Sequence, residues 1–315
     1  MLTQEKLIEE IHRLKKEKNA IILAHYYQIP EIQDIADFIG DSLALSQKAK
    51  TVDNEIIVFC GVHFMAETAK ILNPTKKVIL PDLEAGCSLA DSCPATDFED
   101  FLKKYPDHKV ITYINSSAAV KTMTDIVCTS SNARQIVEYL PVNQKIVFAP
   151  DKNLGAYINS VTGRKMVLWE GACHVHNLLT TEAVLKLKMK HTDAKVVAHP
   201  ECNAAVLAIA DYIGSTNGMI KFTTSDLAQK YIVASETGIL HQMKTLSPEK
   251  EFLVVPSDEG CSCNDCPFMK QNTLEKLYNC MLSEMPEILM SKDLMDKGRV
   301  PIERMLEISA ELKLI

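Results

Sequence analysis

The chain has 315 residues, of which 47% are hydrophobic and 24% are charged, and its formal net charge is -7. A chain of this length and composition folds without disulfides, which excludes a disordered or collagen-like protein. Its 41 acidic residues outnumber 34 basic ones, so we expect no nucleic-acid partner. Since no apolar run is long enough to span a bilayer, we expect no membrane partner either.

Residues 1–19 form the first predicted element, an amphipathic helix. Leu7, Ile8, Ile11 and Leu14 recur at helical spacing among lysines and glutamates. The segment lacks the apolar core of a signal peptide, which predicts a cytoplasmic location. Disulfides are rare in a reducing cytosol, so the ten cysteines are expected to pack in the core, bind metal or take part in chemistry.

Short apolar segments rich in β-branched residues then alternate with helical patterns to the end of the chain. Continuous apolar strands between helices are typical of parallel sheets that are covered on both faces, so the predicted fold class is α/β. The predicted strands and the turns that end them lie at residues 19–27, 54–64, 76–82, 109–115, 124–132, 144–151, 164–171, 194–201, 211–219, 230–238 and 251–258.

Polar strand ends recur with a period of about 85 residues. Each repeat has three such strand ends, of which the first two are polar and the third is acidic. The first strand ends lie at 24–28, 114–118 and 199–203, the second at 60–64, 128–132 and 214–218, and the third at 80–82, 149–151 and 234–236. This repeat predicts three analogous α/β domains around a pseudo-threefold axis. We place them at 1–107, 108–192 and 193–315, the last with the C-terminal helix, and we expect the active site in the central cavity between them.

Each predicted domain carries one cysteine-bearing loop. The loops contain Cys87, Cys173, and the group Cys261, Cys263 and Cys266. Three thiolates suit a [4Fe-4S] cluster that keeps one iron free of protein ligand, and such an iron is a Lewis acid.

Other cysteine arrangements are also compatible with the spacing. A local zinc knot could use Cys261, Cys263, Cys266 and Cys93, or the same loop could be a redox loop, although only one Cys-x-x-Cys pair is present. Cys60, Cys128 and Cys280 lie in apolar patterns, and we assign them to the core.

Two histidines, His174 and His176, directly follow Cys173. Their spacing on a predicted strand end would place both on the same side. A histidine beside a ligand cysteine more often supports the ligand than binds metal, so we leave both outside the metal site.

With these residues in view, the chain resembles the quinolinate synthase family of NAD biosynthesis. The resemblance covers nearly the whole chain and rests on the joint order of AHYYQ, GDSLALS, PDLEAGCS, TYINSSAAVK, CTSSNA, WEGACHVH, HPEC, GSTNGM and CPFM. It implies three α/β domains around a pseudo-threefold axis and cluster ligands at Cys87, Cys173 and Cys266. Cys261 and Cys263 are left over, and the regulatory Cys-x-x-Cys-x-x-Cys pattern of the family is not reproduced.

The resemblance also implies the reaction and its site. Iminoaspartate would condense with dihydroxyacetone phosphate to give quinolinate, phosphate and two waters, with the open iron acting in the dehydration. Glu201 is the implied catalytic base, with Tyr27, His25 and Tyr113 as catalytic partners, and enclosure is expected to raise its pKa. The implied substrate-binding residues are His25, Ser42, Tyr113, Ile114, Asn115, Ser130, His199, Pro200, Glu201 and Thr216.

Three rival functions share iron-sulfur chemistry with this family. Another [4Fe-4S] hydro-lyase would share the open iron but would ignore dihydroxyacetone phosphate. An iron-sulfur redox sensor would need an exposed recognition surface, of which the sequence gives no sign. The Cys-x-x-x-Cys-x-x-Cys loop of radical S-adenosylmethionine enzymes is absent. Besides its two substrates, the enzyme that supplies iminoaspartate is the expected partner.

Overall fold

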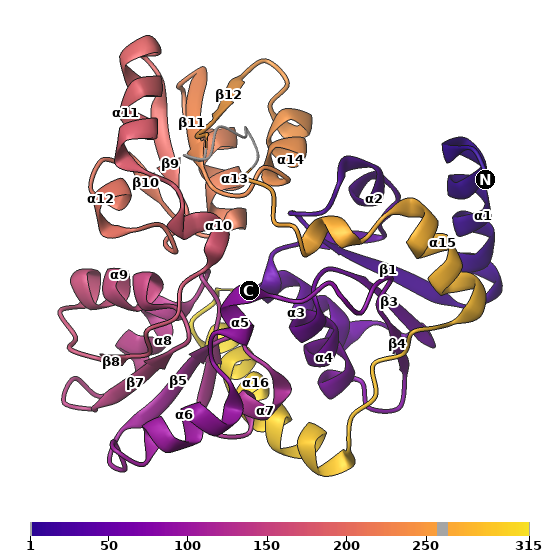
Figure 1. Ribbon diagram of the computed structural model, residues 1–315, viewed down its shortest axis with the longest axis horizontal. Helices are drawn as coiled ribbons and strands as arrows, with labels where there is room; N and C mark the ends of the chain where they lie inside the picture. The colour runs from indigo at the N-terminus through magenta and orange to yellow at the C-terminus, as the bar shows by residue number, and fades with distance from the viewer. Residues whose placement is uncertain (1, 257–263, 315) are drawn as a thin grey trace.

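The computed structural model describes residues 2–256 and 264–314, and its helices and strands form three lobes around a common centre (Figure 1). We call these lobes the first, second and third unit. No described helix combines the length and the apolar character that crossing a membrane requires.

The first unit contains the strands β1 (Ala20–His25), β2 (Phe38–Gly40), β3 (Ile56–Cys60) and β4 (Lys77–Ile79). All their pairings are parallel. The helices of this part of the chain are α1 (Gln4–Glu17), α2 (Pro30–Ile35), α3 (Ser42–Thr51), α4 (His63–Leu72), α5 (Ser88–Asp91) and α6 (Ala95–Leu102).

The second and third units repeat this pattern. The second contains β5 (Lys109–Tyr113), β6 (Ile126–Cys128), β7 (Ile146–Ala149) and β8 (Val167–Leu168), with α7 (Ala118–Lys121), α8 (Ala133–Tyr139), α9 (Lys152–Thr162) and α10 (His174–Asn177). The third contains β9 (Lys195–Ala198), β10 (Tyr212–Ile213), β11 (Lys230–Ala234) and β12 (Glu251–Val254), with α11 (Thr181–Lys190), α12 (Ala204–Leu207), α13 (Thr216–Ser225) and α14 (Ile239–Leu246).

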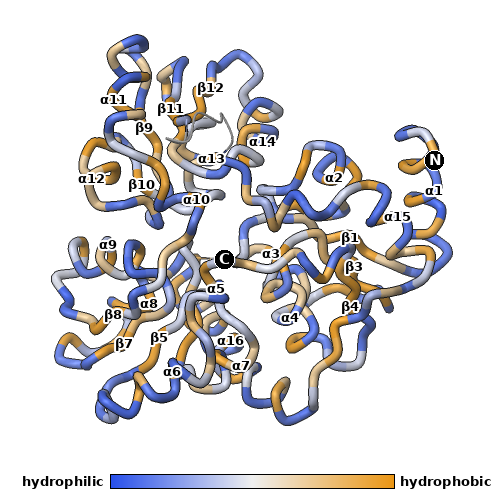
Figure 2. Tube along the Cα trace, viewed as in Figure 1, coloured by the Kyte–Doolittle hydropathy of each residue, from blue (hydrophilic) through white to orange (hydrophobic). Residues whose placement is uncertain are grey.

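The strand order is the same in every unit. The sheets read β2-β1-β3-β4, β6-β5-β7-β8 and β10-β9-β11-β12. The predicted α/β class and its three repeated units are therefore confirmed. In the first sheet, successive residues of β1 face opposite sides: Ile21 and Leu23 pack in one core cluster, and Ile22 and Ala24 in another. Figure 2 shows these central strands as mostly hydrophobic segments, whereas hydrophilic and hydrophobic residues alternate along the helices.

The structure contains one strand, β2, that the sequence pattern does not predict. Without β2, the predicted repeat of the first unit is displaced by one strand. β2 has only three residues and lies at the sheet edge, so it gives little apolar signal. The strand ends at 128–132 and 214–218 therefore correspond to the end of β2, and not to 60–64 as predicted. Likewise the acidic ends at 149–151 and 234–236 correspond to the end of β3, and not to 80–82.

The helix before each first strand packs with the unit that follows it in sequence. Phe98 of α6 contacts the core of the second sheet, and Val184 of α11 lies in the core of the third. The boundaries predicted at 107/108 and 192/193 stay predictions.

The C-terminal segment leaves the third unit. It contains a short 3-10 helix, η1 (Met269–Gln271), then α15 (Leu274–Ser283) and α16 (Lys292–Glu311). Leu277 of α15 packs in the outer core of the first unit. Arg299 of α16 donates to the Ile71 carbonyl (2.8 Å), and Asn132 of the second unit donates to Ser309 of α16 (3.0 Å). The helix predicted with the third unit thus lies between the first two (Figure 1).

Candidate active site

The loops that follow the strands of all three units line one central cavity. This position agrees with the rule that ligands bind beyond the carboxyl ends of parallel strands. Ile114 and Pro200 are buried near it without lining it. The other predicted site residues all line it: His25, Tyr27, Ser42, Cys87, Tyr113, Asn115, Ser130, Cys173, His199, Glu201, Thr216 and Cys266.

Three cysteines reach the cavity from equivalent places in the repeat, because each follows the fourth strand of its unit. Cys87 directly precedes α5 and Cys173 directly precedes α10. Burial raises the pKa of Cys87 to about 12 and that of Cys266 to about 11, and it holds the pKa of Cys173 well above its ordinary value. Cys87 is also close enough for the charges of Cys173 and Cys266 to interact with its own.

This donor set fits an iron-sulfur cluster. Thiolates are the ligands that such clusters use, and a bound metal reverses the cost of ionising buried thiols. Cys261 and Cys263, which the zinc-knot alternative needs, lie outside the described residues. Cys93 is buried in a separate core cluster with Phe98 and Val110.

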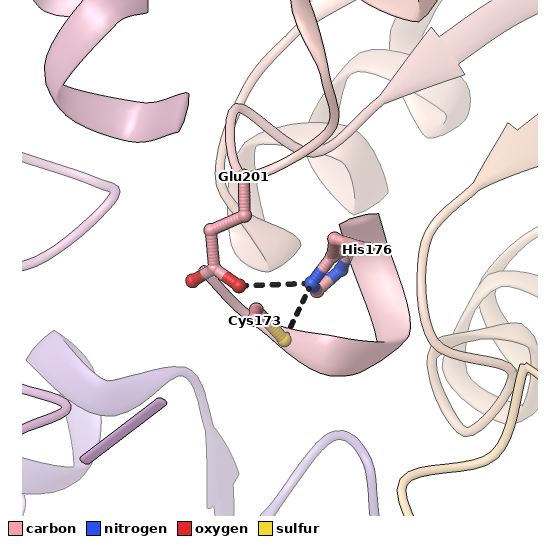
Figure 3. Close-up of side chains that lie close together, drawn as sticks. All are labelled: Cys173, His176 and Glu201. Carbon is pink, nitrogen blue, oxygen red and sulfur yellow. Dashed lines mark hydrogen bonds and ion pairs between the residues drawn. The ribbon is translucent and has the colours of Figure 1, made fainter. Parts of the chain in front are cut away.

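Glu201 and His176 form a buried pair beside Cys173 (Figure 3). The His176 Nδ1 atom lies 2.8 Å from Glu201 Oε2 and 3.3 Å from Cys173 Sγ, and its Nε2 atom lies 3.2 Å from Ser235 Oγ. One ligand atom from each of Cys173, His176 and Glu201 lies within 4.8 Å of the others. The imidazole therefore connects the cysteine to the carboxylate.

The predicted placement of the two histidines is wrong. Residues 174–177 form a helical turn, α10, and not a strand end. Residues two apart on a helix point in different directions, so His174 is exposed whereas His176 is buried.

The prediction that enclosure raises the pKa of Glu201 is wrong in direction. Burial alone would raise this pKa. The nearby His199 and His176, together with hydrogen bonds from His176 and Tyr113, instead hold it well below its ordinary value. Glu201 is therefore a carboxylate, the form that accepts a proton.

Neutral donors surround this carboxylate. Burial lowers the pKa of both His25 and His199 to about 3, so both imidazoles are uncharged near neutral pH. The ring of His199 stacks on that of His176, with centroids 4.5 Å apart. Burial also raises the pKa of Tyr27 and Tyr113 well above the ordinary value, which keeps both phenols protonated.

The two phenols join the units through hydrogen bonds. The Tyr27 hydroxyl lies 3.0 Å from Ser235 Oγ and accepts from Thr216 Oγ1 at 3.0 Å. Tyr113 is hydrogen-bonded to Glu201 and to Ser130. The hydrogen bonds of Tyr27 therefore join the first unit to the third, and those of Tyr113 join the second unit to the third.

A second network crosses all three units. Ser131 Oγ lies 2.6 Å from Asp41 Oδ2 and 2.8 Å from Ser215 Oγ. These residues are chain neighbours of Ser130, Ser42 and Thr216, three of the hydroxyl residues that line the cavity.

Sequence reasoning assigned no site role to Asp41, His176 or Glu236, all of which line the cavity. Asp41 lies in the GDSLALS motif, and Glu236 ends an acidic strand of the predicted repeat. Their position next to recognised motifs was the available signal. Nothing in the local sequence shows that His176 turns toward Glu201, which lies in the third unit.

The fold and the cavity define an α/β protein of three repeated units in which each unit supplies one cysteine to a shared site. The chain belongs to the family described as quinolinate synthetase A protein, whose model matches residues 9–307. This match confirms the resemblance seen in the sequence.

Curated relatives named quinolinate synthase match almost the full chain. The relative from Prochlorococcus marinus (strain MIT 9313) is 56% identical over 97% of this chain and 92% of its own length. That from Chloroherpeton thalassium is 56% identical over 98% of this chain and 96% of its own length. That from Synechocystis sp. (strain PCC 6803) is 54% identical over 96% of this chain and 95% of its own length.

Proposed function

We propose that this chain condenses iminoaspartate with dihydroxyacetone phosphate in the central cavity and releases quinolinate, phosphate and two waters. Membership in the quinolinate synthase family makes the chain an enzyme of NAD biosynthesis. The observation that carries the proposal is one cavity that combines three cysteines, a buried carboxylate and neutral hydrogen-bond donors. A cytoplasmic location and an association with the enzyme that supplies iminoaspartate stay predictions.

Cys87, Cys173 and Cys266 would hold one [4Fe-4S] cluster. The support is that each comes from the equivalent loop of a different unit and that all three line the same cavity. When bound, such a cluster with one iron free of protein ligand supplies Lewis-acid chemistry for the loss of a hydroxyl group.

The polar residues of the cavity would bind and orient the substrates. Iminoaspartate carries two carboxylates, which need hydrogen-bond donors. Neutral imidazoles such as His25 and His199 and protonated phenols such as Tyr113 donate without adding net charge. The hydroxyls of Ser42, Ser130 and Thr216 and the amide of Asn115 would complete this donor set.

Glu201 would move the proton. Its carboxylate is ionised and buried, and His176 and Tyr113 fix its orientation. In this arrangement Glu201 accepts a proton from the substrate carbon and becomes neutral, while the electron pair of the broken C–H bond stays on the substrate. Exclusion of water strengthens each of these electrostatic interactions.

The direct test is product formation by anaerobically purified protein given dihydroxyacetone phosphate and freshly generated iminoaspartate. We expect quinolinate by mass spectrometry, and we expect it to disappear after the iron is chelated. Protein with a full complement of iron and sulfide that forms no quinolinate would contradict the reaction. Turnover of a hydroxy acid without the triose phosphate would favour another hydro-lyase.

The ligand assignment is tested by single replacements. Cys87→Ala, Cys173→Ala and Cys266→Ala should each abolish the cluster absorbance, whereas Cys60→Ala, at a buried core position, should retain it. Full iron in any of the first three variants would contradict the assignment. Loss of metal confined to variants of Cys173, His176 and Glu201 would indicate a single-ion site instead.

A further inference from the structure

The acidic strand ends have no role in the chemistry above, yet two of them contact cysteine loops. Asp151 follows β7 and Glu236 follows β11, so both come after the third strand of their unit. Both side chains are fully buried. Burial of a carboxylate is costly unless its oxygens accept hydrogen bonds, so the partners of these oxygens are informative.

In the second unit, Asp151 connects a helix start to a cysteine. Its Oδ1 atom accepts from the Leu154 backbone N–H at 2.7 Å, at the start of α9. Its Oδ2 atom accepts from the Cys173 backbone N–H at 3.1 Å. A parallel β-bridge between Asp151 and Gly171 holds the same loop.

In the third unit, Glu236 makes the equivalent connection. Its Oε2 atom accepts from the Gly238 backbone N–H at 2.7 Å, just before α14. Its Oε1 atom accepts from the Cys266 backbone N–H at 3.0 Å and from Lys270 Nζ at 2.8 Å. Lys270 in turn donates to the Tyr27 carbonyl of the first unit at 2.7 Å.

Among its described residues, the first unit has no carboxylate that connects a helix start to its cysteine loop. Its equivalent residue is Val62, which cannot accept a hydrogen bond through its side chain. A backbone connection is common to all three units, because the N–H groups of His63, Lys152 and Thr237 donate to the carbonyls of Ala85, Gly171 and Asn264 at 2.7, 2.8 and 3.4 Å. The carboxylate is thus an additional connection in the second and third units. Asp82, which the sequence had aligned with Asp151 and Glu236, pairs with Lys276 instead.

We propose that Asp151 and Glu236 are positioning residues that hold the Cys173 and Cys266 loops in place for an iron-sulfur cluster. The inference rests on the cluster site proposed above. A carboxylate offers one oxygen to the helix start and one to the cysteine loop, whereas an amide of the same shape offers only one oxygen. Asp151→Asn and Glu236→Gln therefore lose one of the two connections without creating a cavity.

The test measures how fast the reconstituted cluster loses iron to an excess of chelator, followed by cluster absorbance under anaerobic conditions. We expect iron loss to be about 10-fold faster in each variant, because one hydrogen bond to a charged acceptor is lost. Asp125→Asn is the matched control, because the Asp125 carboxylate also accepts from a backbone N–H, that of Val110 at 2.8 Å, but lies outside the cysteine loops. This variant should lose iron at the wild-type rate. The melting temperatures of the apo-proteins should stay within a few degrees of the wild type.

The outcomes separate the inference from the cluster proposal. Wild-type protein that holds no iron after reconstitution contradicts the cluster site itself. Normal iron in the wild type with wild-type loss rates in both variants overturns only the positioning role. Faster loss that is matched by Asp125→Asn, or that scales with a lower melting temperature, also overturns it, because general destabilisation then accounts for the result.

Discussion

The first and second units close the same loop with different side chains. In the first unit, the Gln33 amide donates to the carbonyls of Tyr26 and Gln28, each at 2.9 Å. In the second unit, Lys121 donates to the carbonyls of Ile114 (2.9 Å) and Ser116. The two donors lie at the same distance along the chain from the end of the unit's first strand, and the carbonyls correspond one to one.

The comparison of Gln33 with Lys121 separates the need for hydrogen-bond donors from the effect of a positive charge. Gln33 and Lys121 are 1% and 0% exposed, so both satisfy carbonyls that water does not reach. An amide does this without charge, which shows that the loop geometry needs only donors. Lys121 adds a buried cation, whose pKa burial lowers to about 8. Its ammonium lies 5.6 Å from the ring centroid of Phe64, which lines the cavity.

The third unit uses neither donor. Leu207 occupies the equivalent position, and Asn153 of the second unit donates to the Glu201 carbonyl at 3.0 Å. The central residues of the three loops are Tyr27, Asn115 and Glu201, and all three line the cavity. The repeat therefore supplies one backbone frame three times, and the chemistry differs with the residue placed at its centre.

The largest expected effect follows from replacing the central residue of the third loop. Glu201→Gln keeps the shape of the side chain but removes the group that accepts the proton. We expect normal iron and sulfide content and a loss in kcat of about 100-fold or more. Steady-state kinetics of quinolinate formation measure this, with Glu182→Gln on the exposed face of α11 as the control. Substantial turnover by Glu201→Gln would exclude Glu201 as an obligatory base.

Much of this comparison could be predicted from the sequence. The long apolar strands predicted the α/β class, and the recurring strand ends predicted three units and a shared cavity. β2 could not be found from periodicity, because a three-residue edge strand shows neither alternation nor a long apolar run. Without β2 in the prediction, the acidic strand end of the first unit was aligned with the wrong strand of the other two units.

The sequence predicts which residues lie at the cavity, but it does not predict the environment of each side chain. Most of the proposed residues line the cavity, yet the low pKa of Glu201 depends on His199 and His176. His176 comes from another part of the chain and from a helical turn, where the sequence pattern predicts a strand end. Likewise Lys121 lies inside a recognised motif, but its burial depends on packing against the first unit. Contacts between units are not encoded in local patterns.

An intermediate effect is expected from breaking the second loop. Lys121→Met leaves the Ser116 carbonyl without a donor, whereas the Ile114 carbonyl still accepts from the Ser116 N–H at 2.8 Å. The loss of these contacts should lower the free energy of unfolding by about 1–3 kcal/mol. Lys121→Gln imitates the first unit and should recover at least half of that loss. Urea unfolding of the apo-proteins measures both values. Equal destabilisation by the two variants would show that the loop requires the charge, and the comparison with Gln33 would fail.

The smallest effect concerns pH and isolates the charge of Lys121. Its pKa is about 8 in the folded protein and 10.5 as the ordinary value. Between these values the unfolded chain binds a proton that the folded chain has released, so the free energy of unfolding rises with pH. Below pH 8 both states carry the proton and the cost of burying the charge is constant.

The measurement compares wild-type protein with Lys121→Gln, because buried thiols titrate in the same range and their contribution cancels in the difference. From pH 8 to pH 9 the wild type should gain about 1 kcal/mol relative to the variant, since one proton per pH unit corresponds to at most about 1.4 kcal/mol. Parallel pH profiles would mean that the Lys121 ammonium keeps its proton in the fold. The Phe64 ring and the two carbonyls would then compensate for its burial, and the lysine would cost the second unit no more than Gln33 costs the first.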